Sequence, residues 1–429
     1  MPVAVVLAGL AVGAVGVLCT LLLHLVQHLL YGYHAGTFLL GVEATSPRRR
    51  VLALAAAGPV VGTAWWWHRR HVDGDSLSVT RALRDHSARL PLLHTLIDAA
   101  LQVVAVGAGA SMGREGAPRQ AGAALGTWIG GRLGLLAAQR STLLAAGAGA
   151  GLAVVYDVPV AGVCFTLELL LGSLAWRRVV PTVVVTGIAT VVSWPVLTRQ
   201  PSYVVHGTGF SWPVLAAAAP IGILAAAAGL GFSAIMRAAR EHAPGGATVI
   251  GAVTVGFVFV GLLGARYPAL LGNGKGLAQV AFAGTVSVGA LAVMTVLKPV
   301  ATAACLRAGA IGGLLTPALA TGAAGGLLAG RGWDRVWPGG PGVDYALLGA
   351  AAMLAVTQRA AWTAMVLTVE LTRADPGVVP ALVLAVAVAV LTVRLGTGRP
   401  VRDATPTQHN GLHATGLDQA AGGGRSDHP

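Results

Sequence analysis

Charged side chains are scarce in this sequence. Only 10% of its 429 residues are charged, whereas 55% are hydrophobic; soluble domains carry about 25% charged residues. A chain with so little charge cannot cover itself with a solvated surface, which excludes an ordinary soluble domain. We therefore expect an all-α polytopic membrane protein, located in the cell membrane.

Cysteine is rarer still. The three residues, Cys19, Cys164 and Cys305, lie within apolar segments, and their spacing fits neither a disulfide framework nor a metal site.

Enzyme signatures are missing too: there is no H-E-x-x-H, no G-x-S-x-G and no Walker A sequence in the right context. Ser111 lies near Glu115, but no suitably placed histidine motif accompanies it. We expect no enzyme activity, no metal and no cofactor.

Acidic residues are scarcer than basic residues. There are 16 aspartates and glutamates against 29 lysines and arginines, which gives a formal net charge of +13. The basic residues gather in short loops, at 48–50, 69–70 and 177–178, where lysine and arginine set membrane topology. This interpretation is favoured over nucleic-acid binding, and a positive protein also raises the local concentration of anions.

Apolar stretches fill most of the chain up to about residue 400. Many exceed the roughly 20 residues that span hydrocarbon, and several are interrupted by glycine or proline. We expect one transmembrane domain over 1–400, with many tilted and part-spanning helices, and a disordered cytoplasmic tail over 401–429. The candidate segments are 3–31, 51–67, 93–112, 142–167, 179–198, 210–236, 247–265, 277–303, 308–330, 345–371 and 377–395.

The two halves of the chain resemble each other. Residues 113–121 can be laid on residues 312–320 so that a glycine, a proline and an alanine coincide at a constant offset. A second match follows in the same order, near the same offset. Many secondary transporters build a midplane site from inverted repeats with broken helices at corresponding positions. We expect a first repeat over about 30–200 and a second over about 210–400.

Glu115 is a carboxylate within oily sequence, in the run Gly-Arg-Glu-Gly over 113–116. A charge at bilayer depth is costly and usually serves an ion or proton path. The glycines and proline around it break a helix and leave free backbone N–H groups that attract anions. We interpret Glu115 as a gate that occupies an anion site until it is protonated. The alternatives are a structural carboxylate paired with Arg114 or Arg119, or one that snorkels to a loop.

The matching turn of the second repeat carries no charge. Gly313, Leu314, Leu315 and Thr316 precede Pro317, and what they offer a ligand is backbone N–H groups. Leucines there would keep water and cations out. The turn is therefore a second candidate for anion binding, and an ordinary Gly-Pro break between packed helices is the alternative.

Other charged residues in apolar sequence favour structural roles. Glu168 and Glu370 each end an apolar helix, in equivalent places of the two repeats. Asp157 lies at a helix break, and we expect it to cap the helix that begins at Pro159. For Lys298, lining an anion vestibule, snorkelling and pairing with a glutamate all remain open.

The order of these motifs resembles the CLC family of chloride channels and proton-coupled chloride transporters, over about residues 70–400. Residues 113–116 look like the signature G-[KR]-E-G-P, whose glutamate is the gate. Three further segments are similar to family motifs: 158–162 to A-P-L-A-G, 267–274 to P-x-x-x-G-x-G, and 309–317 to G-x-x-G-G-x-F-x-P. The resemblance implies an inverted-repeat CLC-like architecture, a homodimer, and transport of chloride or a similar small monovalent anion.

Several family positions differ in this sequence. The family's anion-contacting serine aligns with Gly74, although Ser76 lies close by, and Leu315 stands where the family has phenylalanine. The late tyrosine that closes the inner side of the site falls near Arg402. Leu169 stands where an exchanger has its inner proton glutamate, which leaves proton coupling open. These departures imply an anion held mainly by backbone N–H groups and helix dipoles.

The resemblance places the anion where the turns at 74–76, 113–117 and 313–316 converge. Glu168 is the candidate for a proton path. The alternatives are a passive channel with the same gate, a carrier of another anion, and a non-transporting membrane sensor or scaffold. The predicted anion-binding residues are Gly74, Ser76, Arg114, Gly116, Ala117, Gly313, Leu314, Leu315 and Thr316.

Overall fold

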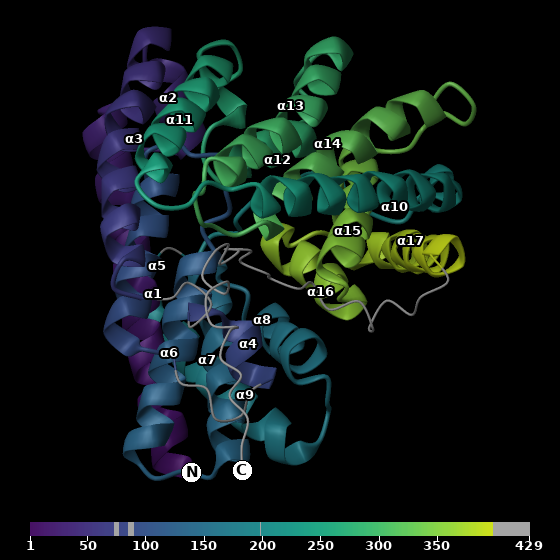
Figure 1. Ribbon diagram of the computed structural model, residues 1–429. Helices are drawn as coiled ribbons and strands as arrows, with labels where there is room; N and C mark the ends of the chain where they lie inside the picture. Colours follow the sequence, from purple (N-terminus) through teal and green to yellow (C-terminus); the bar gives the residue numbers. More distant parts are fainter. Residues whose placement is uncertain (73–76, 85–89, 198, 398–429) are drawn as a thin grey trace, which may run out of the picture.

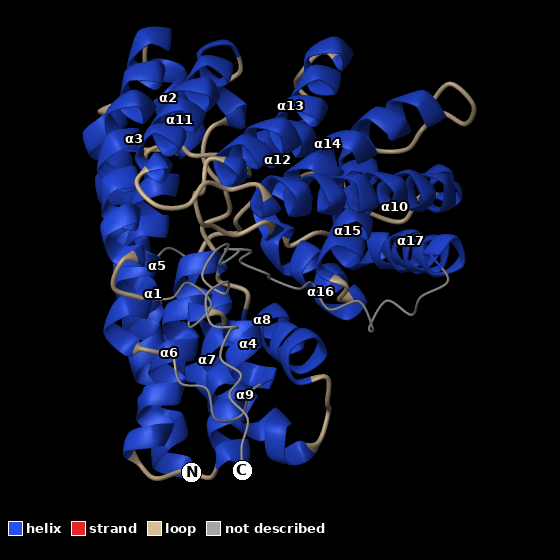
Figure 2. Cartoon of the chain, in the orientation of Figure 1, coloured by secondary structure: helices blue, strands red, loops and turns tan. Residues whose placement is uncertain are grey.

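The structure is a computed structural model that describes residues 1–72, 77–84, 90–197 and 199–397. The expected tail over 401–429 lies outside this range. Figure 2 shows helices and loops but no strand in the described part. The α-helices are α1 (Pro2–Tyr31), α2 (Phe38–Ala44), α3 (Pro47–Arg69), α4 (Val79–Arg84), α5 (Leu92–Gly107), α6 (Gly116–Arg132), α7 (Ala137–Tyr156), α8 (Pro159–Phe165), α9 (Trp176–Ser193), α10 (Trp212–Glu241), α11 (Thr248–Arg266), α12 (Lys275–Ala283), α13 (Val288–Arg307), α14 (Leu315–Trp333), α15 (Gly342–Gln358), α16 (Ala361–Thr372) and α17 (Val379–Thr397). Three shorter segments are the π-helix η2 (Thr166–Leu171) and the 3₁₀ helices η3 (Pro268–Leu270) and η4 (Pro376–Val378).

Few of these helices are both long enough and apolar enough to cross a membrane alone. Five described segments qualify by length and apolar composition: α1, α10, α11, α13 and the segment that contains α17. Leu18, Val255 and Leu391 are exposed on three of them, as a lipid-facing surface requires. Many of the remaining helices are shorter and buried among their neighbours, which confirms the prediction of an all-α membrane protein with part-spanning helices.

Helix packing follows the internal repeat. In the first half α6 packs against α7 and α1 against α9, and in the second half α14 packs against α15 and α10 against α17. The long helices α1 and α10 are both 30 residues long. The two halves meet along α3 and α11, which lie side by side in the upper left of Figure 1.

Glycine lets the paired helices approach closely at equivalent places. A Cβ atom on Gly122 in α6 would lie 2.2 Å from the carbonyl oxygen of Gly147 in α7. A Cβ atom on Gly322 in α14 would lie 2.5 Å from the carbonyl oxygen of Gly349 in α15. Such backbone contact replaces the bulky core of a soluble protein, because small residues are what bring helices together in lipid.

Glu168 connects the first half of the chain to the second. Its side chain leaves η2 and reaches the first turn of α16. There Oε1 accepts a hydrogen bond from the backbone N–H of Trp362 (3.2 Å), and Oε2 accepts from the backbone N–H of Thr363 (2.7 Å). The Thr363 hydroxyl donates to the same oxygen at 2.7 Å. Glu168 therefore fills the free donors at the start of a helix in the other repeat.

Glu370 makes the reverse connection from the second half to the first. Its Oε1 accepts from the N–H of Val160 (3.1 Å) and its Oε2 from the N–H of Ala161 (2.6 Å), both in the first turn of α8. Each glutamate thus caps a helix of the opposite repeat. The sequence favoured a helix-end role for both glutamates. These crossed caps show what that role is: each glutamate accepts hydrogen bonds from the first turn of a helix in the other repeat.

The expectation that Asp157 caps the helix at Pro159 is wrong. Asp157 ends α7 with a left-handed backbone, φ +55°, and its Oδ1 accepts a hydrogen bond from the Trp194 indole at 3.0 Å. Its Oδ2 lies 3.8 Å from the Arg373 guanidinium. The side chain therefore points away from α8, and Glu370 supplies the cap instead.

We predict that Gly122→Ala and Gly322→Ala destabilise the fold, because the new methyl group would collide with the backbone of the neighbouring helix. Gly131→Ala is the matched control on α6, since a Cβ there meets nothing within 4 Å. Alanine is the better helix former by up to about 1 kcal/mol. Thermal unfolding in detergent should show a lower Tm for the first two variants and an unchanged or higher Tm for the third. Equal Tm values in all three would contradict the packing argument.

We predict that Glu370→Gln lowers stability by about 1–3 kcal/mol, because an amide retains only one acceptor oxygen and leaves an N–H of α8 unsatisfied. Glu168→Gln should behave alike at α16. The control is Glu241→Gln, at the exposed end of α10. A Tm for Glu370→Gln and Glu168→Gln that matches the control would show that the crossed caps contribute nothing.

Candidate functional site

Two broken-helix turns, one from each repeat, meet at the centre of the molecule. Gly109 after α5 and Gly309 after α13 both adopt left-handed backbones, φ +108° and +93°, which turn the chain back toward the next helix. The turns then pair. The N–H of Gly113 donates to the carbonyl of Gly313 at 2.7 Å, and the N–H of Gly313 donates back at 2.9 Å. This antiparallel bridge fixes the start of α6 against the start of α14.

The Glu115 carboxylate lies at this junction and is fully buried. Its Oε1 accepts a hydrogen bond from the backbone N–H of Leu315 at 2.9 Å. Its Oε2 accepts from the hydroxyls of Tyr156 and Thr316, both at 3.0 Å. Leu315 begins α14, so the negative charge lies at a helix N-terminus, where the backbone dipole favours it. The side chain of one repeat therefore occupies the anion-attracting end of a helix in the other.

Glycine at the two paired positions makes room for this carboxylate. A Cβ atom on Gly113 would lie 2.1 Å from Glu115 Oε1, and one on Gly313 would lie equally close. Any larger residue at either position would collide with the carboxylate. The glycines of the two repeat motifs thus leave the space that the Glu115 carboxylate occupies, besides allowing the backbone to turn.

The arginines beside Glu115 do not pair with it. The Arg114 guanidinium donates to the carbonyl of Val155 at 2.9 Å and lies 4.8 Å from the centre of the Tyr156 ring. Arg119 lies over the Phe165 ring, 4.4 Å from its centre. In the part of the chain that the structure describes, no ion pair joins Glu115 to an arginine. Neutral donors hold the carboxylate, and the positive charges stay at longer range.

Most of the other predicted anion-binding residues line the same junction. Gly116 packs close to Gly313: a Cβ atom on Gly116 would lie 3.0 Å from the backbone nitrogen of Gly313. Ala117 is buried and Leu314 is half-buried. Gly74 and Ser76 lie outside the described residues, as does the segment near Arg402. Glu168 is engaged at α16, as described above, and makes no hydrogen bond to Glu115.

Tyr156 is the contact that the sequence did not identify. It ends α7, one residue before the helix break, and its hydroxyl lies 2.6 Å from that of Thr316 as well as 3.0 Å from Glu115. The available signal was its place two residues before the segment 158–162. Nothing in the local pattern indicated that its ring would turn toward Glu115, since the two residues are 41 positions apart in the chain.

Lys298 is a second buried ionisable side chain, and its hydrogen-bond partners include no carboxylate. Its fully buried ammonium donates to the carbonyls of Leu270 (3.0 Å) and Gly272 (2.8 Å) and to the Ser111 hydroxyl (2.8 Å). All three donors of an ammonium are then used. The lysine neither snorkels nor pairs with a glutamate.

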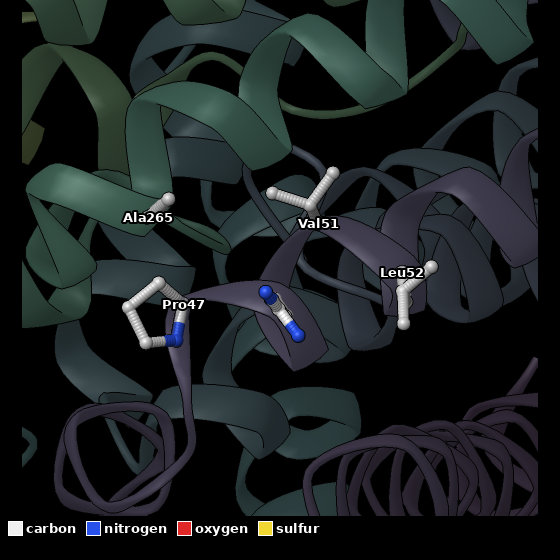
Figure 3. Close-up of a pocket in the computed structure, with 5 residues that line it drawn as sticks. Pro47, Val51, Leu52 and Ala265 are labelled. Carbon is white, nitrogen blue, oxygen red and sulfur yellow. The ribbon is translucent and has the colours of Figure 1, made fainter.

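A surface groove lies apart from this junction, between α3 and α11. Figure 3 shows Pro47, Val51, Leu52 and Ala265 around it, and Arg48 completes the wall. Its lining is apolar apart from the arginine. It shares no residue with the Glu115 site and offers no convergent N–H or hydroxyl donors, so we do not assign it to an anion path.

Comparison with known sequences agrees with the motif order. Residues 59–394 match the family described as voltage gated chloride channel. The chain is similar to a putative chloride channel protein ClcB-like from Ralstonia nicotianae, with 31% identity over 71% of this chain and 73% of that protein. It is also similar to the H(+)/Cl(-) exchange transporter ClcA from Cronobacter sakazakii, with 31% identity over 69% of this chain and 66% of that protein.

Comparison with solved structures shows the same fold. A slow cyanobacterial Cl-/H+ antiporter superposes with a TM-score of 0.81 at 21% identity, covering 93% of this chain and 95% of that one. A CLC-type fluoride/proton antiporter gives 0.71 at 20% identity, covering 90% and 93%. With its paired turns, its buried glutamate and these similarities, the chain belongs to the voltage gated chloride channel, or CLC, family.

Proposed function

We propose that this protein moves chloride across the cell membrane in exchange for protons, through one pathway per subunit gated by Glu115. The observation that carries the proposal is the fully buried Glu115 carboxylate at the N-terminus of α14. A site that binds a tethered carboxylate through N–H and hydroxyl donors has the chemistry to bind a free monovalent anion. The relatives named as chloride/proton exchangers support the choice of substrate.

The gate works by competition between two anions for one set of donors. While ionised, Glu115 fills the site and a chloride ion must displace it. Protonation removes the negative charge, so the attraction to the α14 dipole weakens and the side chain can leave. Lower pH therefore favours the open pathway, and the same proton is carried by the gate as it moves.

The inner half of the proton path differs from the exchanger pattern. Leu169 stands at the position of the family's inner proton glutamate, and the Glu168 carboxylate is held by three hydrogen bonds at α16. We propose that protons reach Glu115 from the inside by another route, such as a file of water. Exchange is then slower than in relatives that hold the glutamate, because no fixed carboxylate relays the proton.

We further propose that the protein is a homodimer, as the family resemblance implies. Light scattering of the detergent-purified protein would give twice the chain mass of 43.1 kDa after the detergent is subtracted. A mass equal to one chain would contradict this part of the proposal.

Glu115→Gln and Glu115→Ala should make anion flux independent of pH, because neither side chain can take up or release the gating proton. Flux of the unmodified protein should rise as pH falls. The measurement is chloride efflux from liposomes at several pH values, with Glu241→Gln as the control. A pH dependence that survives in both Glu115 variants would rule out this residue as the gate.

Coupling of chloride flux to proton movement is tested by a separate measurement. An imposed chloride gradient should drive protons uphill in liposomes that hold the unmodified protein and should fail to do so with Glu115→Ala. Chloride flux without proton movement would identify a passive channel. Absence of both flux and anion binding would favour a sensor or scaffold that has kept the fold.

A further inference from the structure

Two hydroxyl groups converge on the gate from opposite halves of the molecule. Tyr156 belongs to α7 and Thr316 to α14, yet both oxygens lie 3.0 Å from Glu115 Oε2 and only 2.6 Å from each other. Both residues are buried, with exposures of 5% and 2%. The pair is therefore a fixed feature of the site rather than a surface contact.

The surroundings hold the two hydroxyls in place. Tyr156 ends the long buried helix α7, and the Arg114 guanidinium lies against its ring at 4.8 Å. Thr316 is the second residue of α14, whose start is fixed by the Gly113–Gly313 bridge. Neither hydroxyl depends on Glu115 for its position, so both donors stay at the site when the glutamate leaves.

The family's hydroxyl ligands are not at their usual positions in this sequence, although Ser76 lies close to one of these positions. Gly74 aligns with the family's serine, and the segment near Arg402 aligns with its tyrosine. A backbone N–H and a helix dipole alone discriminate weakly between anions. Hydroxyl donors from elsewhere in the fold would restore a complete set of ligands.

We propose that Tyr156 and Thr316 are the hydroxyl ligands of the transported anion in this protein. When Glu115 leaves, a chloride-sized anion takes the place of its carboxylate and accepts hydrogen bonds from both hydroxyls and from the Leu315 N–H. This inference rests on the proposed function and adds the residues that determine its specificity. The donor set is neutral, which suits a monovalent halide better than a doubly charged oxyanion.

The same protons cannot serve the gate and the anion together. Each hydroxyl has one proton to donate, and the two hydroxyls also lie within hydrogen-bond distance of each other at 2.6 Å. An anion that accepts from both hydroxyls therefore uses both protons and leaves none for Glu115 Oε2. The hydroxyl pair thus makes occupancy by the carboxylate and by the anion mutually exclusive. It also stabilises both occupants, which is why its contribution to anion binding must be measured with the glutamate removed.

The experiment uses the full-length protein in detergent with the Glu115→Ala substitution, and titrates chloride by calorimetry. Adding Tyr156→Phe or Thr316→Val should weaken chloride binding by about tenfold or more, the loss expected for one hydrogen bond to an anion. Thr316→Ser should restore the affinity, because it returns the hydroxyl. Thiocyanate, which is larger and has a more diffuse charge, should lose less affinity than chloride, since its interaction with a hydroxyl is weaker at longer distance.

Two controls remove hydroxyls outside the site. Thr321→Val lies on the same helix, where its hydroxyl donates to the carbonyl of Pro317, and Tyr345→Phe removes a hydroxyl that donates to Asp334. Both should leave the chloride affinity unchanged. Thermal unfolding of every variant shows that the fold is retained, and Thr316→Ala replaces Thr316→Val if the latter does not fold.

The outcomes separate this inference from the proposed function. Chloride binding that is intact in Glu115→Ala and unaffected by Tyr156→Phe and Thr316→Val would overturn the hydroxyl assignment alone. An equal loss for chloride and thiocyanate would also overturn it, because that result indicates a collapsed site. No chloride binding in Glu115→Ala, together with flux that stays pH-dependent, would overturn the gate and the hydroxyl assignment together.

Discussion

The centre of this protein depends on a buried carboxylate that is held by neutral donors. Burying a charge without partners is prohibitive, so Glu115 requires the Leu315 N–H and the two hydroxyls of Tyr156 and Thr316 at its oxygens. The rest of the junction follows from that requirement. The glycine turns leave space for the carboxylate, their bridge positions α14, and α7 brings the tyrosine.

Lys298 is a buried group of the opposite charge, and it too is held by neutral hydrogen-bond partners. The Lys298 ammonium is surrounded by the carbonyls of Leu270 and Gly272 and by the Ser111 hydroxyl. In both cases backbone groups and side-chain hydroxyls replace the hydrogen bonds that water would supply. In the function that we propose, the glutamate differs because its donors also suit a small mobile anion, whereas the lysine ties α13 to the neighbouring loops.

The sequence predicted what depends on local pattern and on symmetry. Glu115 and the turn at 313–316 could be paired because their motifs lie at a constant offset, and the structure brings them together. The contact of Tyr156 with Glu115 and that of Glu168 with Thr363 could not be predicted, since each joins residues far apart whose orientation depends on the packed fold. The Asp157 cap was wrong for a related reason: a left-handed backbone at that residue turns the side chain away.

The crossed caps and the glycine bridge also bear on how the pathway can move. Rotating one repeat against the other would break the Gly113–Gly313 pair and the hydrogen bonds of Glu168 and Glu370 at the same moment. Rotation about the bonds of the Glu115 side chain, by contrast, breaks neither the glycine pair nor the crossed caps. In the gating that we propose, the moving part is therefore a single side chain, and the helices around it keep their positions.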